Sequence, residues 1–251
     1  MPARTMSRAV LSNLCTALTN GTLTDMSATS TARERARAEL TGEIKDAARR
    51  QLAEVGAHGL SLRAVARELG MVSSALYRYF PSRDQLLTAL IIDAYDALGE
   101  AAESADKPGE DPRERWRAVW HAARAWARDH PHEYALIYGS PIPGYQAPRD
   151  TIASAGRVAL TLVEVIKSGA LRPIPDCPEL PDQLREQAAV LAATLGVDLP
   201  ATTVTRLLMA WTQLFGSISF ELFGQYVGSV DPSDAFFAHT TRQMADFVGL
   251  V

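Results

Sequence analysis

Hydrogen-bonding side chains are concentrated in one short stretch of the sequence, SSALYRYFPSRDQLL, at residues 73–87. Serine and tyrosine hydroxyls and arginine guanidinium groups are side chains that contact base edges and phosphates in nucleic acids. Pro81 cannot continue a helix, so the helix that carries Tyr77 and Arg78 must end there. The stretch therefore predicts a short helix whose polar end, with Arg83 just beyond it, can clamp a phosphate backbone.

Three histidines offer a second kind of chemistry, metal binding or proton transfer. His130 and His132 flank Pro131, which breaks the helical face that would align them, and no acidic residue accompanies these two or His121 at a ligand-like spacing. The sequence also lacks a P-loop, a glycine-rich dinucleotide turn and a G-x-S-x-G elbow. We therefore expect no catalytic residue, no metal, no cofactor and no enzymatic activity.

The elements around the polar stretch predict how it is presented. A long helix is expected from residue 31 to about 55, ended by Gly56 and Gly59. Ser61 offers an N-cap for a helix over 62–69, and Gly70 closes that helix in a tight turn. The next helix is expected to turn three apolar side chains inward, namely Val72, Leu76 and Phe80. This arrangement is a helix-turn-helix whose second helix fits the DNA major groove.

The rest of the chain also reads as helices. Ser82 with Gln85 forms a capping box for a connector helix over 83–104, and Asp111 with Pro112 starts the helices that follow the 106–112 boundary. We expect an all-α protein with three parts. These are a poorly ordered leader (1–30), a three-helix helix-turn-helix domain (31–83), and a larger helical domain for ligand binding and dimerisation (84–251).

Charge and cysteine content narrow the class of protein. The net charge is −4, yet residues 31–90 hold ten Lys and Arg against seven Asp and Glu, so a basic surplus is confined to the segment with the polar stretch. Cys15 and Cys177 lie too far apart to suggest a disulfide framework or a metal cluster. No apolar run reaches the length of a membrane span. These features favour a cytoplasmic protein without a membrane partner.

The segment GLSLRAVARELGMVSSALYRYFPSRDQLLTALI resembles the N-terminal domain of TetR-type transcriptional regulators across nearly all of residues 40–90. The resemblance implies base contacts from Ser73, Ser74 and Ala75. It also implies phosphate contacts, from Ser61, Tyr77, Tyr79 and Arg83. The family often has Ser or Thr where this chain has Val72, so Ser73 is expected to cap the recognition helix one residue later.

The C-terminal segments HPHEYALIYGSPIPGYQAP and AWTQLFGSISFELFG resemble the WHG subgroup of these regulators. The resemblance implies a ligand chamber and a two-fold helix bundle. Aromatic side chains that could line the chamber, or equally pack in an ordinary core, are Trp116, Trp120, Tyr134 and Tyr138. Large apolar side chains able to form the dimer interface are Leu207, Trp211, Leu214, Ile218, Phe236 and Phe237.

Two functions from different classes fit these patterns. The first is a homodimeric regulator, most often a repressor, that binds a palindromic double-stranded DNA operator and is released by a small apolar effector. The alternative is a helical ligand- or protein-binding module that does not bind DNA. An enzyme using the histidines ranks behind both.

Overall fold

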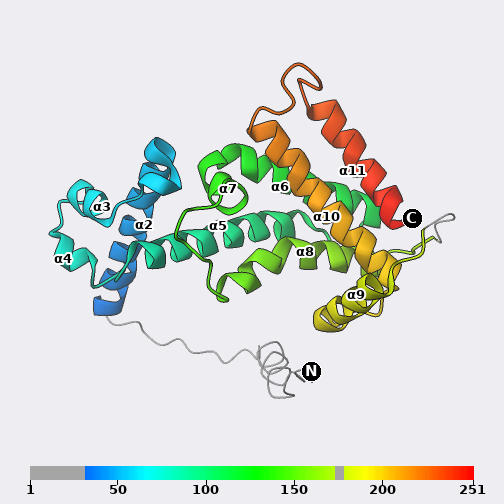
Figure 1. Ribbon diagram of the computed structural model, residues 1–251, viewed down its shortest axis with the longest axis horizontal. Helices are drawn as coiled ribbons and strands as arrows, with labels where there is room; N and C mark the ends of the chain where they lie inside the picture. Colours follow the sequence, from blue (N-terminus) through cyan, green and yellow to red (C-terminus); the bar gives the residue numbers. More distant parts are fainter. Residues whose placement is uncertain (1–31, 173–177) are drawn as a thin grey trace. The chain divides into compact units, whose positions relative to one another are not determined.

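The computed structural model describes residues 32–172 and 178–251, and this part of the chain contains ten helices and no strand (Figure 1). The all-α prediction is confirmed. The predicted leader, Cys15 and Cys177 lie outside the described residues. The helices are α2 (Ala32–Gly59), α3 (Leu62–Glu68), α4 (Ser73–Leu76), α5 (Arg83–Ala105), α6 (Pro112–Asp129), α7 (Pro131–Tyr138), α8 (Thr151–Ser168), α9 (Asp182–Leu195), α10 (Ala201–Leu222) and α11 (Asp234–Val248).

The chain divides at residue 40 into two compact units. The first unit contributes only the start of α2 to the described residues, and everything from Thr41 to Val251 forms the second unit. The predicted domain boundary at residue 83 falls within this second unit, at the start of α5, and stays a prediction.

The turn between α3 and α4 is closed by the backbone of a single glycine. Gly70 has a φ of +64°, which a residue with a side chain rarely adopts. Its conformation lets the Met71 N–H donate to the Ala66 carbonyl at 2.8 Å, the long-range bond of a Schellman motif. The helix therefore ends abruptly, and α4 begins at Ser73, three residues after Gly70.

One prediction about this turn is wrong. Val72 was expected to point inward, but its side chain is 71% exposed, because its extended backbone makes it the N-cap of α4 rather than a residue of the helix. Leu76 and Phe80 are buried as predicted. Ser61 is the N-cap of α3, also as predicted, although its side chain makes no capping hydrogen bond.

The connector helix α5 begins with the predicted cap, because Ser82 Oγ accepts from the Gln85 N–H at 3.1 Å. Along its length α5 packs against α6 and α8. Gly99 permits a close approach to α8, since a Cβ at this position would lie 2.7 Å from Cβ of Arg157. Arg157 then spans the two helices by ion pairs to Asp96 and Glu103 of α5.

The larger core lies among α5, α6, α8, α10 and α11, and α9 packs against α10. Figure 1 shows α10 beside α11 at the C-terminal end of the chain. Asp111 caps α6 by accepting from the N–H groups of Arg113 and Glu114, and Pro112 occupies the first turn, as predicted.

A separate group of buried apolar side chains comes from α2, α3, α4 and the start of α5, and includes Ile44, Leu52, Val65, Leu76, Leu86 and Leu87. No helix among the described residues is long and apolar enough to cross a membrane.

Candidate nucleic-acid interface and aromatic core

The short helix α4 and the turn after it have one buried and one exposed side. Leu76 is fully buried, whereas Ser74, Tyr77 and Arg78 are exposed. The chain remains coiled beyond α4, because the Arg78 N–H donates to the Ala75 carbonyl at 3.2 Å. Hydroxyl and guanidinium groups are therefore presented from one face of a short segment.

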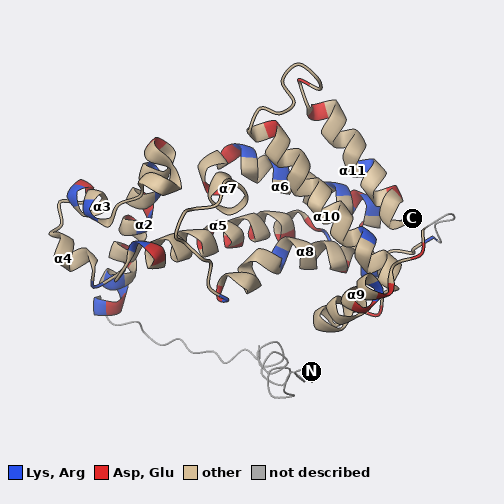
Figure 2. Ribbon diagram, viewed as in Figure 1, with Lys and Arg blue, Asp and Glu red and all other residues tan. Residues whose placement is uncertain are grey.

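The other predicted contact residues are less exposed. Ser73, Ala75 and Ser61 are half-buried, as is Tyr79, which is engaged in interactions within the protein. Figure 2 shows basic and acidic residues together on α3, while α4 carries neither. The exposed positive charges nearest in sequence to α4 are those of Arg78 and, on α3, of Arg67 and Arg63.

Arg83 has a structural partner that the sequence pattern did not reveal. Its guanidinium donates to the backbone carbonyls of Leu60 at 3.1 Å and Ala57 at 2.7 Å, at the end of α2. These carbonyls lie 23 and 26 residues before Arg83, so sequence spacing gives no sign of the pairing. Arg83 Nη1 faces Asp84 at 3.8 Å. The predicted phosphate contact of Arg83 stays a prediction, and most of its hydrogen-bonding capacity is already used.

The residues predicted for the dimer interface divide into two groups. Leu207, Leu214, Ile218 and Phe237 are buried within the protomer and pack in its core. These four side chains are covered by the protomer's own helices, and the predicted interface stays a prediction. Phe236 is exposed and Trp211 is half-buried. The exposed apolar side chains of α10 are instead Leu208, Met209 and Phe220, with Phe223 directly after the helix.

The four aromatic residues predicted for a ligand chamber separate into two groups of ring contacts. Trp116 lies 5.5 Å from Trp120 between ring centroids, and Trp120 lies 6.1 Å from Phe237. Tyr134 lies 5.2 Å from Tyr138. Trp116, Trp120 and Tyr134 are fully buried, so all three belong to the core of this structure.

Tyr138 is the predicted chamber residue that keeps some exposure. Its ring stacks on Phe215 of α10 at 4.2 Å, and Trp211 meets the same phenylalanine edge-on at 5.4 Å. Burial raises the pKa of Tyr138, with smaller contributions from Tyr95 and Tyr134, so the hydroxyl stays neutral. Burial also raises the pKa of Tyr134 to about 12.

Two indole N–H groups have no hydrogen-bond partner in the part of the chain that the structure describes. They belong to Trp120 and Trp211, and both nitrogens are buried. By contrast, Trp116 Nε1 donates to the Thr241 carbonyl at 3.1 Å. A buried donor without an acceptor costs about 1–3 kcal/mol. An acceptor brought in from outside the chain would recover that free energy.

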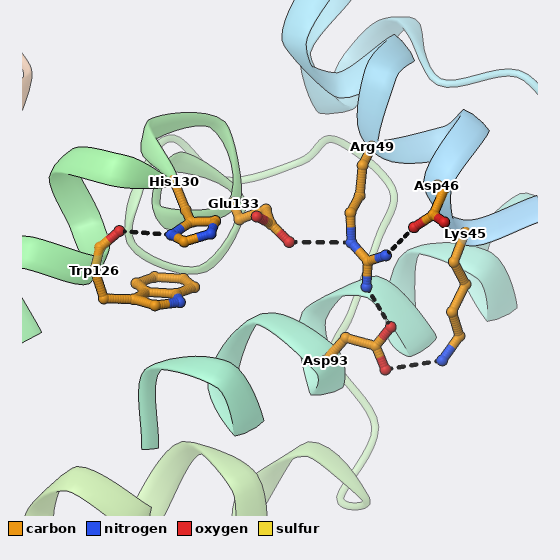
Figure 3. A network of polar contacts seen from close by, with 7 residues as sticks. All are labelled: Lys45, Asp46, Arg49, Asp93, Trp126, His130 and Glu133. Carbon is orange, nitrogen blue, oxygen red and sulfur yellow. Dashed lines mark hydrogen bonds and ion pairs between the residues drawn. The ribbon is translucent and has the colours of Figure 1, made fainter. Parts of the chain in front are cut away.

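Sequence reasoning missed a network of charges between helices α2, α5 and α7 (Figure 3). Arg49 of α2 forms ion pairs with Asp93 of α5 and Glu133 of α7, at 2.7 and 3.1 Å. Lys45 pairs with the same Asp93 at 2.8 Å. The spacing of Lys45 and Arg49 puts both on one face of α2, which was a usable signal, but their acidic partners are distant in sequence.

The histidines do not assemble into a site. His130 is the C-cap of α6 and stacks on Trp126, with its Nδ1 atom 3.0 Å from the Trp126 carbonyl oxygen. His121 is half-buried and meets the ring of Phe237 edge-on. Within residues 32–172 and 178–251, no group of three or more His, Cys, Asp or Glu side chains is placed to hold a metal ion.

A tight-turned pair of short helices with a polar exposed face, attached to a larger helical domain, defines the class of helix-turn-helix DNA-binding proteins. Comparison with known proteins gives the family. Residues 44–90 match the family model for bacterial regulatory proteins of the tetR family, and residues 116–244 match the model for the tetracyclin repressor-like C-terminal domain. The chain belongs to the TetR family of transcriptional regulators, which bind DNA and are not enzymes.

Individual relatives agree with this assignment. An HTH-type transcriptional regulator of Mycobacterium tuberculosis is 40% identical over 225 residues, which cover 85% of this chain and 94% of the relative. A presumed regulatory protein of known crystal structure is 35% identical, with a TM-score of 0.71, and the match covers 86% of this chain and all of the other. A tetR-family regulator from Streptomyces coelicolor, 16% identical over 84% of this chain and 80% of its own, shares the fold with a TM-score of 0.58.

Proposed function

We propose that the protein is a homodimeric, effector-responsive repressor located with its operator DNA in the cytoplasm. Each protomer places α4 in the major groove of one half-site, and a small molecule bound in the C-terminal domain releases the dimer. A two-fold operator needs two recognition helices about 34–36 Å apart, one turn of DNA, which a dimer supplies.

The observation that carries this proposal is the two-sided character of α4. Leu76 and Phe80 fix the segment to the protein, while Ser74, Tyr77 and Arg78 remain exposed. We assign base contacts to Ser73, Ser74 and Ala75 at the start of the helix, where short side chains allow close approach. Phosphate contacts are assigned to Ser61, Tyr77, Tyr79 and Arg83, around the rim of this face.

The dimer interface is assigned to the outer face of α10 with α11. Leu208, Met209 and Phe220 leave apolar surface exposed along α10, and Phe236 does so at the start of α11. Exposed apolar side chains concentrated along one helix mark a surface that another chain covers. Trp211, half-buried on the same helix, lies at the edge of this interface or of the effector site.

The effector-binding site is assigned to the group of aromatic side chains formed by Tyr138, Phe215 and Trp211. Stacked rings favour a flat, neutral and largely apolar molecule, because a charged group would lose its hydration there. The unpaired Trp211 N–H favours a molecule that carries a hydrogen-bond acceptor. Trp116, Trp120 and Tyr134 would support the site from the core.

The proposal is tested by enriching genomic DNA fragments with the purified protein. We expect the enriched fragments to share an inverted repeat, and Tyr77→Phe to weaken binding to all of them by a similar factor. Ser74→Ala should instead change which bases are preferred. A double variant, Tyr77→Ala with Arg78→Ala, is the non-binding control. Enrichment no better than this control would favour a binding module that does not contact DNA.

The effector is tested separately with a library of neutral hydrophobic metabolites. A bound effector should raise the melting temperature by mass action and release the enriched DNA. Tyr138→Ala should abolish release while DNA binding persists. If small charged anions alone stabilised the protein, the aromatic site would be the wrong one.

A further inference from the structure

Helix α7 is fastened to α10 by aromatic side chains on one side. The Tyr134 hydroxyl donates to the Phe215 carbonyl at 3.0 Å and lies 2.8 Å from the Ser219 hydroxyl. Tyr138, one turn later, stacks on the ring of Phe215. Pro131 begins the helix and Gly139 follows its last residue. The helix also packs against α5, where the Tyr95 hydroxyl donates to the Ile137 carbonyl at 3.4 Å. Tyr134 and Tyr138 therefore give α10 a direct contact through which a displacement at Phe215 can reach α7.

The same helix reaches the helix-turn-helix region through one charged side chain. Glu133 precedes Tyr134 directly, and its Oε1 atom accepts from Arg49 Nε of α2 at 3.1 Å (Figure 3). Arg49 uses each of its three guanidinium nitrogens for a different carboxylate. Nη1 donates to Asp46 of α2 and Nη2 donates to Asp93 of α5, both at 2.7 Å.

The three links of Arg49 have different consequences. The Asp46 link stays within α2, and the Asp93 link joins α2 to α5, the helix that continues directly from the helix-turn-helix. Within this network, Glu133 is the member that belongs to a helix fastened to α10. Lys45 adds a second bond to Asp93 at 2.8 Å, so α2 stays attached to α5 without Glu133.

The charged side chains of this network are partly buried. The side chains of Lys45, Arg49, Asp93 and Glu133 are 20–32% exposed, which limits screening by water. A planar guanidinium with a fixed fork can hold several carboxylates in defined directions, which a flexible ammonium group cannot do. Ordering Arg49 against Asp93 also lowers the entropic cost of its bond to Glu133.

We infer that Arg49 and Glu133 are a positioning pair that sets the orientation of the helix-turn-helix relative to α7, and through it the half-site spacing that the dimer accepts. This inference rests on the proposed function, since it requires a dimer that reads two half-sites. An effector that shifts α7 would change the 3.1 Å contact directly. It can alter operator affinity only as far as it favours one orientation over the other.

The test uses the full-length protein and a duplex carrying the inverted repeat that the wild type enriches. Two further duplexes have their half-sites moved together or apart by one base pair. We expect Glu133→Gln and Arg49→Lys each to reduce the preference for the native spacing about three- to fivefold, as the loss of a partly buried ion pair implies. The double variant should lose little more of the spacing preference than either single variant, because the Arg49–Glu133 ion pair is already lost in each of them.

Asp46→Asn is the matched control, because it removes another Arg49 partner without touching α7. It should keep the spacing preference of the wild type. The inference is overturned if wild type and Glu133→Gln prefer the native half-site spacing equally, or if Asp46→Asn loses this preference as much as Glu133→Gln does. Either outcome leaves the proposed function as a DNA-binding regulator untouched. If the wild type enriches no inverted repeat, the proposed dimeric function itself fails.

A DNA-free measurement gives a second readout. Spin labels at Val72→Cys, an exposed position, report the distance between the two helix-turn-helix regions of a dimer once Cys15 and Cys177 are replaced by serine. Glu133→Gln should broaden this distance distribution, whereas Asp46→Asn should not. A purely stabilising role would change the melting temperature and leave the distribution as in the wild type.

Discussion

Arg124 of α6 donates two hydrogen bonds to Glu221 of α10, from Nε at 2.7 Å and from Nη2 at 2.8 Å. The two side chains are only 7% and 16% exposed. The same guanidinium donates to Asp234 and Ser233 at the start of α11, and lies over the ring of Phe237. One buried cation therefore ties together α6, α10 and α11, three of the helices that form the larger core.

Removing this cation should be costly unless its partner is removed as well. Arg124→Met leaves Glu221 buried without its main partner, so we expect a loss of about 3 kcal/mol in the free energy of unfolding. The double variant Arg124→Met with Glu221→Met should be more stable than Arg124→Met alone, because no unpaired charge remains. Urea denaturation of the three proteins checks this. Equal losses for both variants would contradict it.

Acid should destabilise the protein through His121. Burial lowers the pKa of this histidine below its usual 6.5, and repulsion from Arg117 and Arg124 lowers it further. The unfolded chain therefore binds a proton near pH 6.5 that the folded protein does not yet bind. Stability from this residue is complete above pH 6.5 and is lost as the pH falls toward the lower, folded-state pKa.

The measurement is the free energy of unfolding between pH 7.5 and 5.5 for wild type and His121→Phe. The variant should show a shallower loss over this range. His239, exposed on α11, supplies the matched control His239→Phe, whose pH dependence should follow the wild type. Parallel curves for all three proteins would show that His121 does not govern the response.

Two neighbouring tryptophans should differ in their response to loss of the indole N–H. Trp116→Phe removes the hydrogen bond to the Thr241 carbonyl, adding about 1 kcal/mol to the cost of lost volume. Trp120→Phe removes a donor that has no partner among the described residues. Trp120→Phe should therefore be the milder substitution by thermal unfolding, and the reverse order would contradict the assigned bonding.

The exposed face of α10 should control assembly. Met209→Glu with Phe220→Glu places two charges in the proposed interface without altering the protomer core, because both side chains are half exposed. We expect a folded monomer with greatly weakened operator binding, measured by sedimentation and electrophoretic mobility. Val190→Glu, at an exposed apolar position on α9, should remain dimeric. A dimeric double variant would place the interface elsewhere.

Substitution of two arginines near the recognition helix should have different effects on DNA binding and on stability. Arg78 is exposed, so Arg78→Ala should lower the slope of log affinity against log salt by about one and leave the melting temperature unchanged. Arg83→Ala removes three guanidinium bonds to the end of α2, so it should lower the melting temperature as well. Equal melting temperatures for both variants would contradict the structural role of Arg83.

The helix-turn-helix could be predicted because its signals are local. Gly70, Ser82 and Pro81 each act on residues within one turn of themselves, and apolar spacing placed Leu76 and Phe80 correctly. Val72 was misplaced because the apolar spacing of Leu76 and Phe80 extends back to Val72, which precedes the first residue of α4. Periodicity describes a helical face but does not show which residue is the cap.

The C-terminal helices were harder to interpret because two of their faces are apolar. On α10, Leu214 and Ile218 face the protomer core, whereas Met209 and Phe220 face outward. Composition cannot show which of the two apolar faces is buried in the protomer, since this depends on which helices pack against α10. The charge network around Arg49 was missed for the same reason, because its partners come from helices distant in sequence.

The hydrogen bonds from Arg83 to the carbonyls of Ala57 and Leu60 also bear on local unfolding at the end of α2 and the start of α5. The last carbonyls of a helix need partners from outside it, and here Arg83, in the first turn of α5, donates to those of Ala57 and His58 and to that of Leu60 just after the helix. In the folded protein the end of α2 thus depends on a side chain of α5 for these hydrogen bonds. Amide hydrogens in both segments should therefore exchange with solvent together, as one cooperative unit, although more than twenty residues separate them.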